Sequence, residues 1–191
     1  LRAYSVTNPS WAEALQFISI RVPDGPLTSR LGLIEAGDQI FLGRKPTGTL
    51  VADALLPGRR LFMLATGTGL APFLSLARDP EIYEKFEQVV IVHSVRNVAE
   101  LAHRDMLETR LAGDPLVEEE AARQFHYVPT VTREPFRTTG RIGTLIDSGA
   151  LFAGIPGPAA LDPASDRVML CGSMAMVREL ADRLDGAGFT E

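Results

Sequence analysis

The sequence feature that most constrains the fold is the stretch of residues 61–74, LFMLATGTGLAPFL, where an apolar run breaks at Gly67-Thr68-Gly69 and then resumes. The first run is short and bounded by a turn signal, which favours a buried strand of a parallel sheet. Pro72 suits the first turn of a helix, because its missing N–H is not needed there. The stretch therefore predicts a strand, a glycine turn and a helix.

The glycine turn has the properties of an anion site. Gly67 and Gly69 carry no side chain, so a ligand can approach the main chain closely. Free amides at a helix start, together with the helix dipole, attract anions. The third glycine of the usual dinucleotide fingerprint is absent, with Pro72 in its place, so a tight turn that binds no ligand is the alternative. We expect a pyrophosphate to bind at this turn, in contact with Thr66, Gly67, Thr68 and Gly69.

Composition limits the possible partners and the compartment. The 191 residues are 46% hydrophobic, which supplies a core, and the formal net charge of -5 argues against a nucleic-acid partner. No run approaches the roughly 18 apolar residues of a membrane span, so we expect no membrane partner. The single cysteine, Cys171, excludes an intrachain disulfide and favours a cytoplasmic location. The three histidines, His93, His103 and His126, show no metal-ligand spacing, so we expect no metal and place each in the core or on the surface.

The chain divides near Pro57-Gly58. Before this point, partly alternating apolar and polar residues predict antiparallel strands, and one short segment has helical spacing. The expected strands are residues 3–7, 15–22, 39–42 and 49–51, and the expected helix is residues 27–34. An antiparallel β-barrel is the economical closure, although too few strands are visible to complete one.

After this point strands alternate with helices, which predicts an α/β domain with a doubly wound parallel sheet. The expected strands are residues 60–65, 88–95, 125–132 and 167–171. The expected helices are residues 71–78, 99–112 and 174–184, with an irregular crossing through residues 142–148 and 154–163. Ligands of such sheets bind at the carboxyl ends of the strands, so residues 66–72, 93–97, 130–133 and 171–174 should lie along one rim.

Four motifs stand in order along the chain: Arg2-Ala3-Tyr4-Ser5, Gly25-Pro26-Leu27-Thr28-Ser29, Gly67-Thr68-Gly69-Leu70-Ala71-Pro72 and Cys171-Gly172-Ser173-Met174. Together they resemble the ferredoxin (flavodoxin)–NADP reductase family, most closely its bacterial members, over essentially the whole chain. The resemblance implies an FAD-binding β-barrel domain at residues 1–57 and an NADP-binding α/β domain at residues 58–191. It also implies hydride transfer between NADP(H) and FAD, and single-electron transfer between FAD and ferredoxin or flavodoxin.

Family members carry further barrel strands before the first motif, and a strand and tail after the last helix. The chain therefore looks trimmed at both ends, and we expect a monomer.

The resemblance also implies roles in flavin binding. Arg2 would meet the FAD phosphates, Tyr4 would stack on the isoalloxazine, and Ser5 would lie near flavin N5, with Ala3 between them. A guanidinium matches phosphate bidentately, and an aromatic face suits a planar ring. Without the family, Tyr4 reads as a barrel core residue and Ser5 as an ordinary strand position. The FAD pyrophosphate would lie on the start of the short helix, at Gly25, Leu27, Thr28 and Ser29, through backbone amides and hydroxyls.

For the nicotinamide nucleotide, the resemblance places Cys171 beside the nicotinamide, followed by Gly172, Ser173 and Met174. Tyr4, Ser5 and Cys171 are therefore the expected catalytic residues. The resemblance also assigns the contacts with the 2′-phosphate to Thr132, Arg133 and Arg141. It assigns contacts with the other phosphates of the nucleotide to Arg96.

The residues themselves support NADP over NAD. NAD sites commonly place a carboxylate about 20 residues after the glycine turn, whereas a 2′-phosphate calls for arginine. The strand at residues 88–95 is followed by Arg96, with no acid before Glu100.

Two other functions stay open. The same module serves as the reductase component of oxygenase systems, although the chain has no iron–sulfur cysteine motif. A non-catalytic NADP-binding fragment is the reading from a different class, and it would apply if FAD is not retained.

Overall fold

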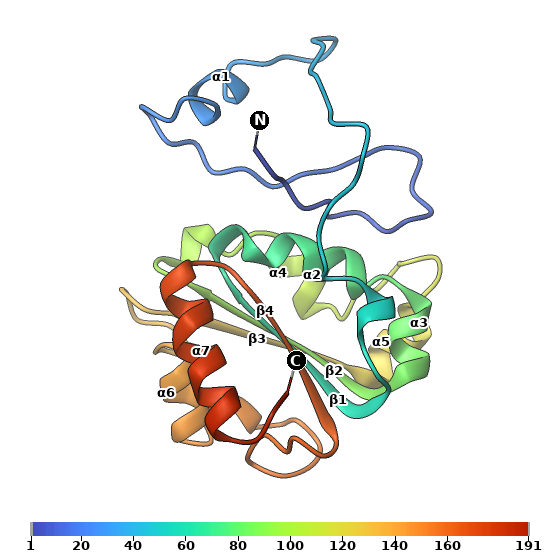
Figure 1. The fold of residues 1–191 in the computed structure, drawn as a ribbon, viewed down its shortest axis with the longest axis vertical. Coiled ribbons are helices and arrows are strands. Elements are labelled where there is room, and N and C mark those ends of the chain that lie inside the picture. Colours follow the sequence, from blue (N-terminus) through green and yellow to red (C-terminus); the bar gives the residue numbers. More distant parts are fainter. Residues whose placement is uncertain (1, 191) are drawn as a thin grey trace.

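The computed structural model describes residues 2–190, so the first residue of one expected domain and the last of the other lie outside it. Residues 58–190 form a four-stranded parallel sheet in the order β3-β2-β1-β4 (Figure 1). The strands are β1 (Gly58–Thr66), β2 (Phe86–Val95), β3 (Phe125–Val131) and β4 (Asp166–Cys171). All four strands expected after Pro57-Gly58 are confirmed, and so is the α/β fold of this part.

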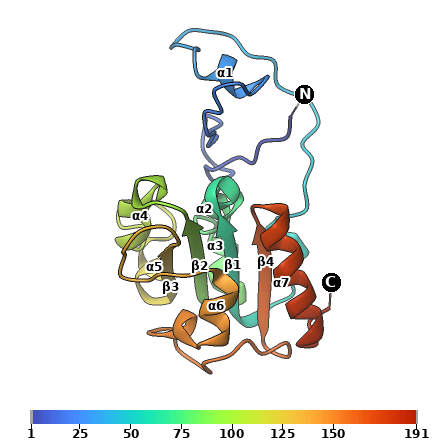
Figure 2. The ribbon, with the colours of Figure 1, turned by 90° about the vertical axis from the view of Figure 1, so that its left-hand side faces the viewer.

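The strands read as apolar runs because both faces of the sheet are covered (Figure 2). Alternate residues of β1 point to opposite faces: Leu61 and Met63 join one core cluster, whereas Phe62 and Leu64 join the other. The first cluster is closed by α2 (Ala71–Leu76), α3 (Pro80–Lys85), α4 (Arg104–Glu108) and α5 (Glu118–Gln124). The second is closed by α6 (Ile142–Asp147), η4 (Ala150–Phe152) and α7 (Met174–Gly186).

Several helical details differ from the prediction. Part of the expected irregular crossing forms the helix α6, and α5 was not among the expected helices. The helix expected at residues 99–112 is broken into η3 (Val98–Glu100) and α4, because His103, Arg110 and Leu111 adopt left-handed backbone angles that no α-helix continues through. The helix α3 was not expected, although its start carries a signal: the Asp79 side chain accepts a hydrogen bond from the Glu81 N–H, with proline in the first turn.

Residues 2–57 contain much less regular structure than expected. Within them the structure forms α1 (Thr28–Leu31), η1 (Ala52–Ala54) and one antiparallel bridge, between Val6 and Phe17. The bridge joins the first two expected strands, but the strands expected at residues 39–42 and 49–51 are not formed. A strand needs a hydrogen-bonded neighbour, and these segments have none among the described residues. The expected β-barrel is therefore not seen here.

Residues 2–57 lie beyond the carboxyl ends of the strands, towards which the arrows of β1 and β2 point in Figure 2. Ile18, Leu50 and Leu55 pack against the first core cluster. The Trp11 ring lies 5.5 Å from the Arg78 guanidinium carbon, and Lys85 Nζ donates to the Ala52 carbonyl at 3.0 Å. The segment is thus attached to the sheet domain along one side.

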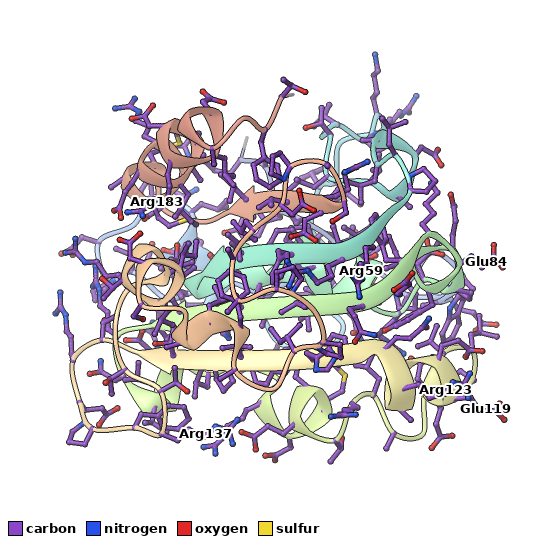
Figure 3. The ribbon with its side chains drawn as sticks, turned by 90° about the horizontal axis from the view of Figure 1, so that it is seen from below. Arg59, Glu84, Glu119, Arg123, Arg137 and Arg183 are labelled. Carbon is purple, nitrogen blue, oxygen red and sulfur yellow. The ribbon has the colours of Figure 1, made fainter. Side chains whose placement is uncertain are left out.

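A buried ion pair joins β1 to β4 at their amino-terminal ends. Arg60 and Asp166 are both fully buried, and Arg60 Nε lies 2.8 Å from Asp166 Oδ1. The same guanidinium donates to the carbonyls of Pro158 and Ala160, at 2.8 and 2.7 Å. It therefore holds in place the irregular loop that precedes β4, which is drawn in front of the sheet in Figure 3.

Candidate functional site

The carboxyl ends of the four strands meet at one edge of the sheet, as expected from parallel pairing. The register places Thr66 beside Ser94, and Ala65 beside Cys171. The strand β4 lies on the side of β1 opposite to β2, so the strand order reverses between β1 and β4. Ligands of open α/β sheets bind at this kind of reversal.

The glycine turn follows β1 as η2 (Gly67–Leu70), which leads into α2 with Pro72 in the first turn. Gly67 has a left-handed φ of 53°, and a Cβ added there would meet no atom within 4 Å. At Gly69 a Cβ would lie 2.2 Å from the Cys171 carbonyl oxygen. Close packing on the end of β4 is therefore one reason why position 69 needs glycine, and its part in binding a ligand stays a prediction.

The segment after β4 docks onto the end of β1. The Ser173 N–H donates to Thr66 Oγ1 at 2.9 Å, and Ser173 Oγ accepts from the Met176 N–H as the N-cap of α7. A Cβ on Gly172 would lie 2.1 Å from Thr66 Oγ1. The structure thus brings the Gly-Thr-Gly turn and the Cys171 motif together at the strand-order reversal.

Cys171 is half-buried, and Met174 at the start of α7 is exposed. Burial raises the pKa of the Cys171 thiol. The thiol is consequently protonated near neutral pH, which suits a residue that shapes a pocket better than a nucleophile.

Hydrogen bonds bring the predicted phosphate-binding residues to the ends of β2 and β3. Thr132 donates to the Val95 carbonyl through its N–H at 3.0 Å and through Oγ1 at 3.1 Å. The Arg133 N–H donates to the Arg96 carbonyl at 2.9 Å. Arg141 reaches the same edge because the preceding residues fold back to form a bridge between Val131 and Thr139.

The charges at this edge are available to a ligand. Arg96, Arg133 and Arg141 are exposed, and none of the ion pairs within residues 2–190 involves their side chains. Glu134, which directly follows Arg133, accepts a hydrogen bond from the Val98 N–H. The acid nearest to Arg96, Glu100, accepts hydrogen bonds from the Arg96 N–H at 3.1 Å and from Asn97 Nδ2 at 3.0 Å. Its carboxylate is therefore engaged by its own loop. Three cationic forks at one edge fit a phosphorylated ligand.

His93 has a place in this site that sequence reasoning did not assign. It lies in the core, as one of our two expectations had it, and its Nε2 is 3.1 Å from the carbonyl oxygen of Gly67 in the glycine turn. The available signal was a histidine at the end of a run of four apolar residues, in QVVIVHSV.

The predicted flavin residues contact one another less than the nucleotide residues do. The Tyr4 ring is half-buried and meets Phe17 edge to face at 6.4 Å, and its hydroxyl is 3.2 Å from Ser19 Oγ. Arg2 and Ser5 are exposed, as is Ala3 between them. An aromatic ring such as that of Tyr4 can stack on a planar ring, and the Arg2 guanidinium is of the right chemistry for a phosphate.

The hydroxyls at the start of α1 are used locally. Thr28 Oγ1 donates to the Val22 carbonyl at 3.2 Å, and Ser29 Oγ donates to the Gly25 carbonyl at 2.6 Å. A Cβ on Gly25 would lie 2.3 Å from Thr28 Oγ1, so this turn needs glycine. Both hydroxyl protons are therefore engaged within the turn, and the part of these residues in binding a phosphate stays a prediction.

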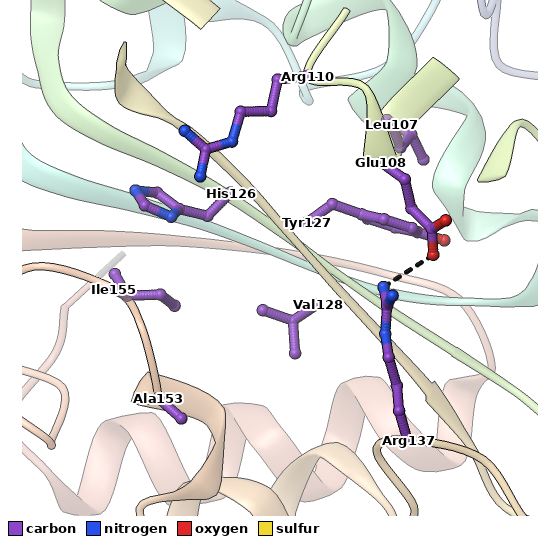
Figure 4. A pocket seen from close by; sticks show the side chains of 9 residues that line it. All are labelled: Leu107, Glu108, Arg110, His126, Tyr127, Val128, Arg137, Ala153 and Ile155. Atoms are coloured by element: carbon purple, nitrogen blue, oxygen red, sulfur yellow. Dashed lines mark ion pairs between the residues drawn. The ribbon is translucent and has the colours of Figure 1, made fainter. Parts of the chain in front are cut away.

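A cavity of about 410 Å³ lies elsewhere, along the outer edge of β3 (Figure 4). Its walls include His126, Tyr127 and Val128 from the middle of the strand, and an ion pair in which Arg137 lies 2.8 Å from Glu108. Because these residues precede the carboxyl end of β3, the cavity is separate from the strand-end site.

Within residues 2–190, no group of three or more His, Cys, Asp or Glu side chains is arranged to hold a metal ion. None of the helices in the same range has the length and apolar character needed to cross a membrane.

Comparison with known proteins places these features in context. Residues 63–182 match the family described as "Oxidoreductase NAD-binding domain". The chain is 52% identical to ferredoxin–NADP reductase A of Sorangium cellulosum, over all of this chain and 68% of that protein. It is 51% identical to the flavodoxin/ferredoxin–NADP reductase of Rhodobacter capsulatus, over all of this chain and 70% of that protein.

Among solved structures, a ferredoxin NADP⁺ reductase from Neisseria gonorrhoeae with bound FAD and NADP is similar, with a TM-score of 0.88 and 31% identity. The match covers all of this chain and 74% of that one.

Proposed function

The chain belongs to the ferredoxin–NADP reductase family, and on this premise we propose how its residues divide the work of the reaction. It is a flavin-dependent oxidoreductase: bound FAD exchanges a hydride with NADP(H) and single electrons with ferredoxin or flavodoxin. We assign NADP(H) binding to residues 58–191 and FAD binding to residues 1–57. The observation that carries the first assignment is the meeting of the glycine turn with the Cys171 motif where the strand order reverses.

In the NADP-binding part, Thr66, Gly67, Thr68 and Gly69 form the pyrophosphate site. Cys171, Gly172, Ser173 and Met174 form the wall against which the nicotinamide lies. The protonated thiol and the N-cap serine keep this wall fixed and uncharged, which helps to orient the reacting ring.

The 2′-phosphate is bound by Thr132, Arg133 and Arg141, and Arg96 meets the remaining phosphates. The support is that these arginines are exposed, lack carboxylate partners within residues 2–190 and sit at the ends of two adjacent strands. Arginine forks bind phosphate bidentately.

In the FAD-binding part, we propose that residues 1–57 complete an antiparallel β-barrel together with further strands of the kind that the longer relatives have room for. The single antiparallel bridge and the exposed apolar side chains of Ile40, Phe41 and Leu42 support this. Tyr4 and Ser5 would face the flavin ring, with Ala3 between them and Arg2. Arg2 would bind the FAD phosphates, with the turn at Gly25, Leu27, Thr28 and Ser29.

The test of the nucleotide assignment is kinetic. The two arginines are assigned to the 2′-phosphate alone, which NADH lacks. Arg133→Ala and Arg141→Ala should therefore each weaken the binding of NADPH by about 1 to 3 kcal/mol and leave the binding of NADH nearly unchanged. Arg123→Ala, in α5 at the opposite edge of the sheet (Figure 3), is the matched control and should change neither. Equal losses of NADPH and NADH activity would exclude a role in reading the 2′-phosphate.

A non-catalytic NADP-binding fragment is the second candidate, because residues 2–57 form only one antiparallel bridge. An absorption spectrum of the purified chain after incubation with FAD separates the two: retained flavin absorbs in the blue. Colourless protein that still binds NADP⁺ would favour the fragment. The cytoplasmic location and the monomeric state also stay predictions, and sedimentation tests the latter.

A further inference from the structure

His93 is an unusual residue for its position. It lies in β2 among apolar neighbours and is fully buried. Burying an imidazole without partners costs about 1 to 3 kcal/mol, so its hydrogen bonds must compensate. It has one on each ring nitrogen: Nε2 lies 3.1 Å from the Gly67 carbonyl oxygen, and Nδ1 lies 3.3 Å from the Tyr127 hydroxyl.

The partners decide the direction of both hydrogen bonds. A carbonyl oxygen only accepts, so Nε2 carries the proton and donates to Gly67. Nδ1 is then the acceptor, and the Tyr127 hydroxyl donates to it. Burial lowers the pKa of His93 to about 4 and raises the pKa of Tyr127, so this arrangement of protons holds at neutral pH. A chain of two hydrogen bonds therefore runs from β3 through β2 to the turn after β1.

The orientation of one peptide group follows from this. The Gly67 carbonyl and the Thr68 N–H belong to the same peptide unit, and no described peptide bond is cis. In a trans peptide the C=O and N–H point in opposite directions. Because His93 holds the Gly67 oxygen, the Thr68 N–H points away from His93 and β2. The strand β4, with the Cys171 motif, lies on the other side of β1.

We propose that His93, supported by Tyr127, is a positioning residue that fixes the Gly67–Thr68 peptide so that the Thr68 N–H faces the pyrophosphate of NADP(H). This inference rests on the proposed nucleotide site. Gly67 alone could not hold the orientation, since glycine moves readily between backbone conformations and a Cβ there would meet nothing within 4 Å.

The test compares a ligand that has the pyrophosphate with one that lacks it. Isothermal calorimetry measures the binding of NADP⁺ and of adenosine 2′-monophosphate to the 191-residue chain and its variants. His93→Leu removes the donor and should raise the NADP⁺ dissociation constant about 10-fold, the effect of losing one hydrogen bond to a charged group. The dissociation constant for adenosine 2′-monophosphate should stay within twofold.

Two further variants keep the test decisive if His93→Leu does not fold. His93→Gln places an amide donor near the position of Nε2 and should restore part of the affinity. Tyr127→Phe removes only the hydroxyl and should weaken the binding of NADP⁺ by less than His93→Leu does. His126→Leu is the control, because this histidine of the neighbouring strand bonds Gln88 instead of the turn and should leave the affinity unchanged.

The outcomes separate the two proposals. Unchanged NADP⁺ affinity in His93→Leu, or in Tyr127→Phe if the former does not fold, overturns the positioning role alone. An equal loss of affinity for both ligands would also overturn it, because that result would mean a general structural effect. If the parent chain binds neither ligand, the nucleotide site itself is wrong, and the positioning role is overturned with it.

Discussion

Residues 58–190 and residues 2–57 differ in how far their apolar side chains are buried. The first part holds every buried apolar residue of the described chain except Pro9 and Ala52. The second holds every exposed large apolar side chain except Leu116 and Met174, and Phe41 has no shielding at all. A parallel sheet with helices on both faces completes its core from consecutive strand and helix units, whereas antiparallel segments depend on neighbouring strands for both hydrogen bonds and cover.

The difference explains why the two parts were predicted unequally well. Buried parallel strands are continuous apolar runs, so the sequence indicated all four. In residues 2–57 the alternating pattern marks a face that needs cover, but it does not say which strand supplies it, and only the Val6–Phe17 bridge forms.

The largest effect is expected from removing the buried ion pair that joins β1 to β4 in the sheet domain. Arg60→Ala leaves Asp166 buried without its partner, and we expect a loss of about 3 to 5 kcal/mol in the free energy of unfolding. Arg59→Ala is the control, because its pair with Glu87 is solvent-exposed and should contribute less than about 1 kcal/mol. Urea unfolding followed by circular dichroism measures both. Similar small losses would mean that the buried pair does not hold β1 to β4.

The second prediction concerns pH. His93 has a pKa of about 4 in the folded chain, against 6.5 when unfolded, because burial outweighs its hydrogen bond to Gly67 and the charge of Glu100; His103 nearby lowers it further. Between these values the unfolded state binds the extra proton, so the stabilisation is complete above pH 6.5 and is lost as pH falls towards 4. The loss from this residue should be about 3 kcal/mol.

Unfolding at pH 7 and at pH 4 measures this dependence, and burial lowers the pKa of His126 in the same sense. In His93→Gln the pH dependence should shrink by most of that amount. The only tryptophan, Trp11, lies in residues 2–57, so its fluorescence reports whether the two parts separate during acidification. An undiminished pH dependence in the variant would assign the effect to other groups.

The third prediction separates two glycines that looked equivalent in the sequence. Gly69→Ala forces a Cβ against the backbone of Cys171 and should cost about 1 to 3 kcal/mol. Gly67→Ala meets no atom but keeps a left-handed φ of 53°, which costs about 1 kcal/mol. Denaturation measures stability, and calorimetry with NADP⁺ measures binding. A smaller loss for Gly69→Ala than for Gly67→Ala would contradict the packing explanation.

This pair also marks the limit of sequence reasoning in the site. The motif indicated where the turn lies, but the partners of its residues come from distant segments. Cys171 follows Gly69 by more than a hundred residues, and His93 and Tyr127 reach the turn from two other strands. Short-range spacing carries no information on such contacts, whereas the arginines at the strand ends could be placed because each directly follows a recognisable strand or turn.

The smallest effect is expected in residues 2–57. Tyr4→Ala removes an edge-to-face contact with Phe17, worth about 0.5 to 1.5 kcal/mol, and the proposed stacking surface for the flavin. Because Tyr4 contributes nothing to the sheet domain's core clusters, unfolding followed by circular dichroism should keep its midpoint while the FAD dissociation constant rises. Tyr4→Phe keeps the ring and loses only the hydroxyl near Ser19, so it should retain FAD like the parent. If both variants weaken FAD equally, the hydroxyl rather than the ring face makes the contact; if neither does, Tyr4 serves only to pack against Phe17. A lowered midpoint in Tyr4→Ala would show that the two parts are more tightly coupled than their contacts indicate.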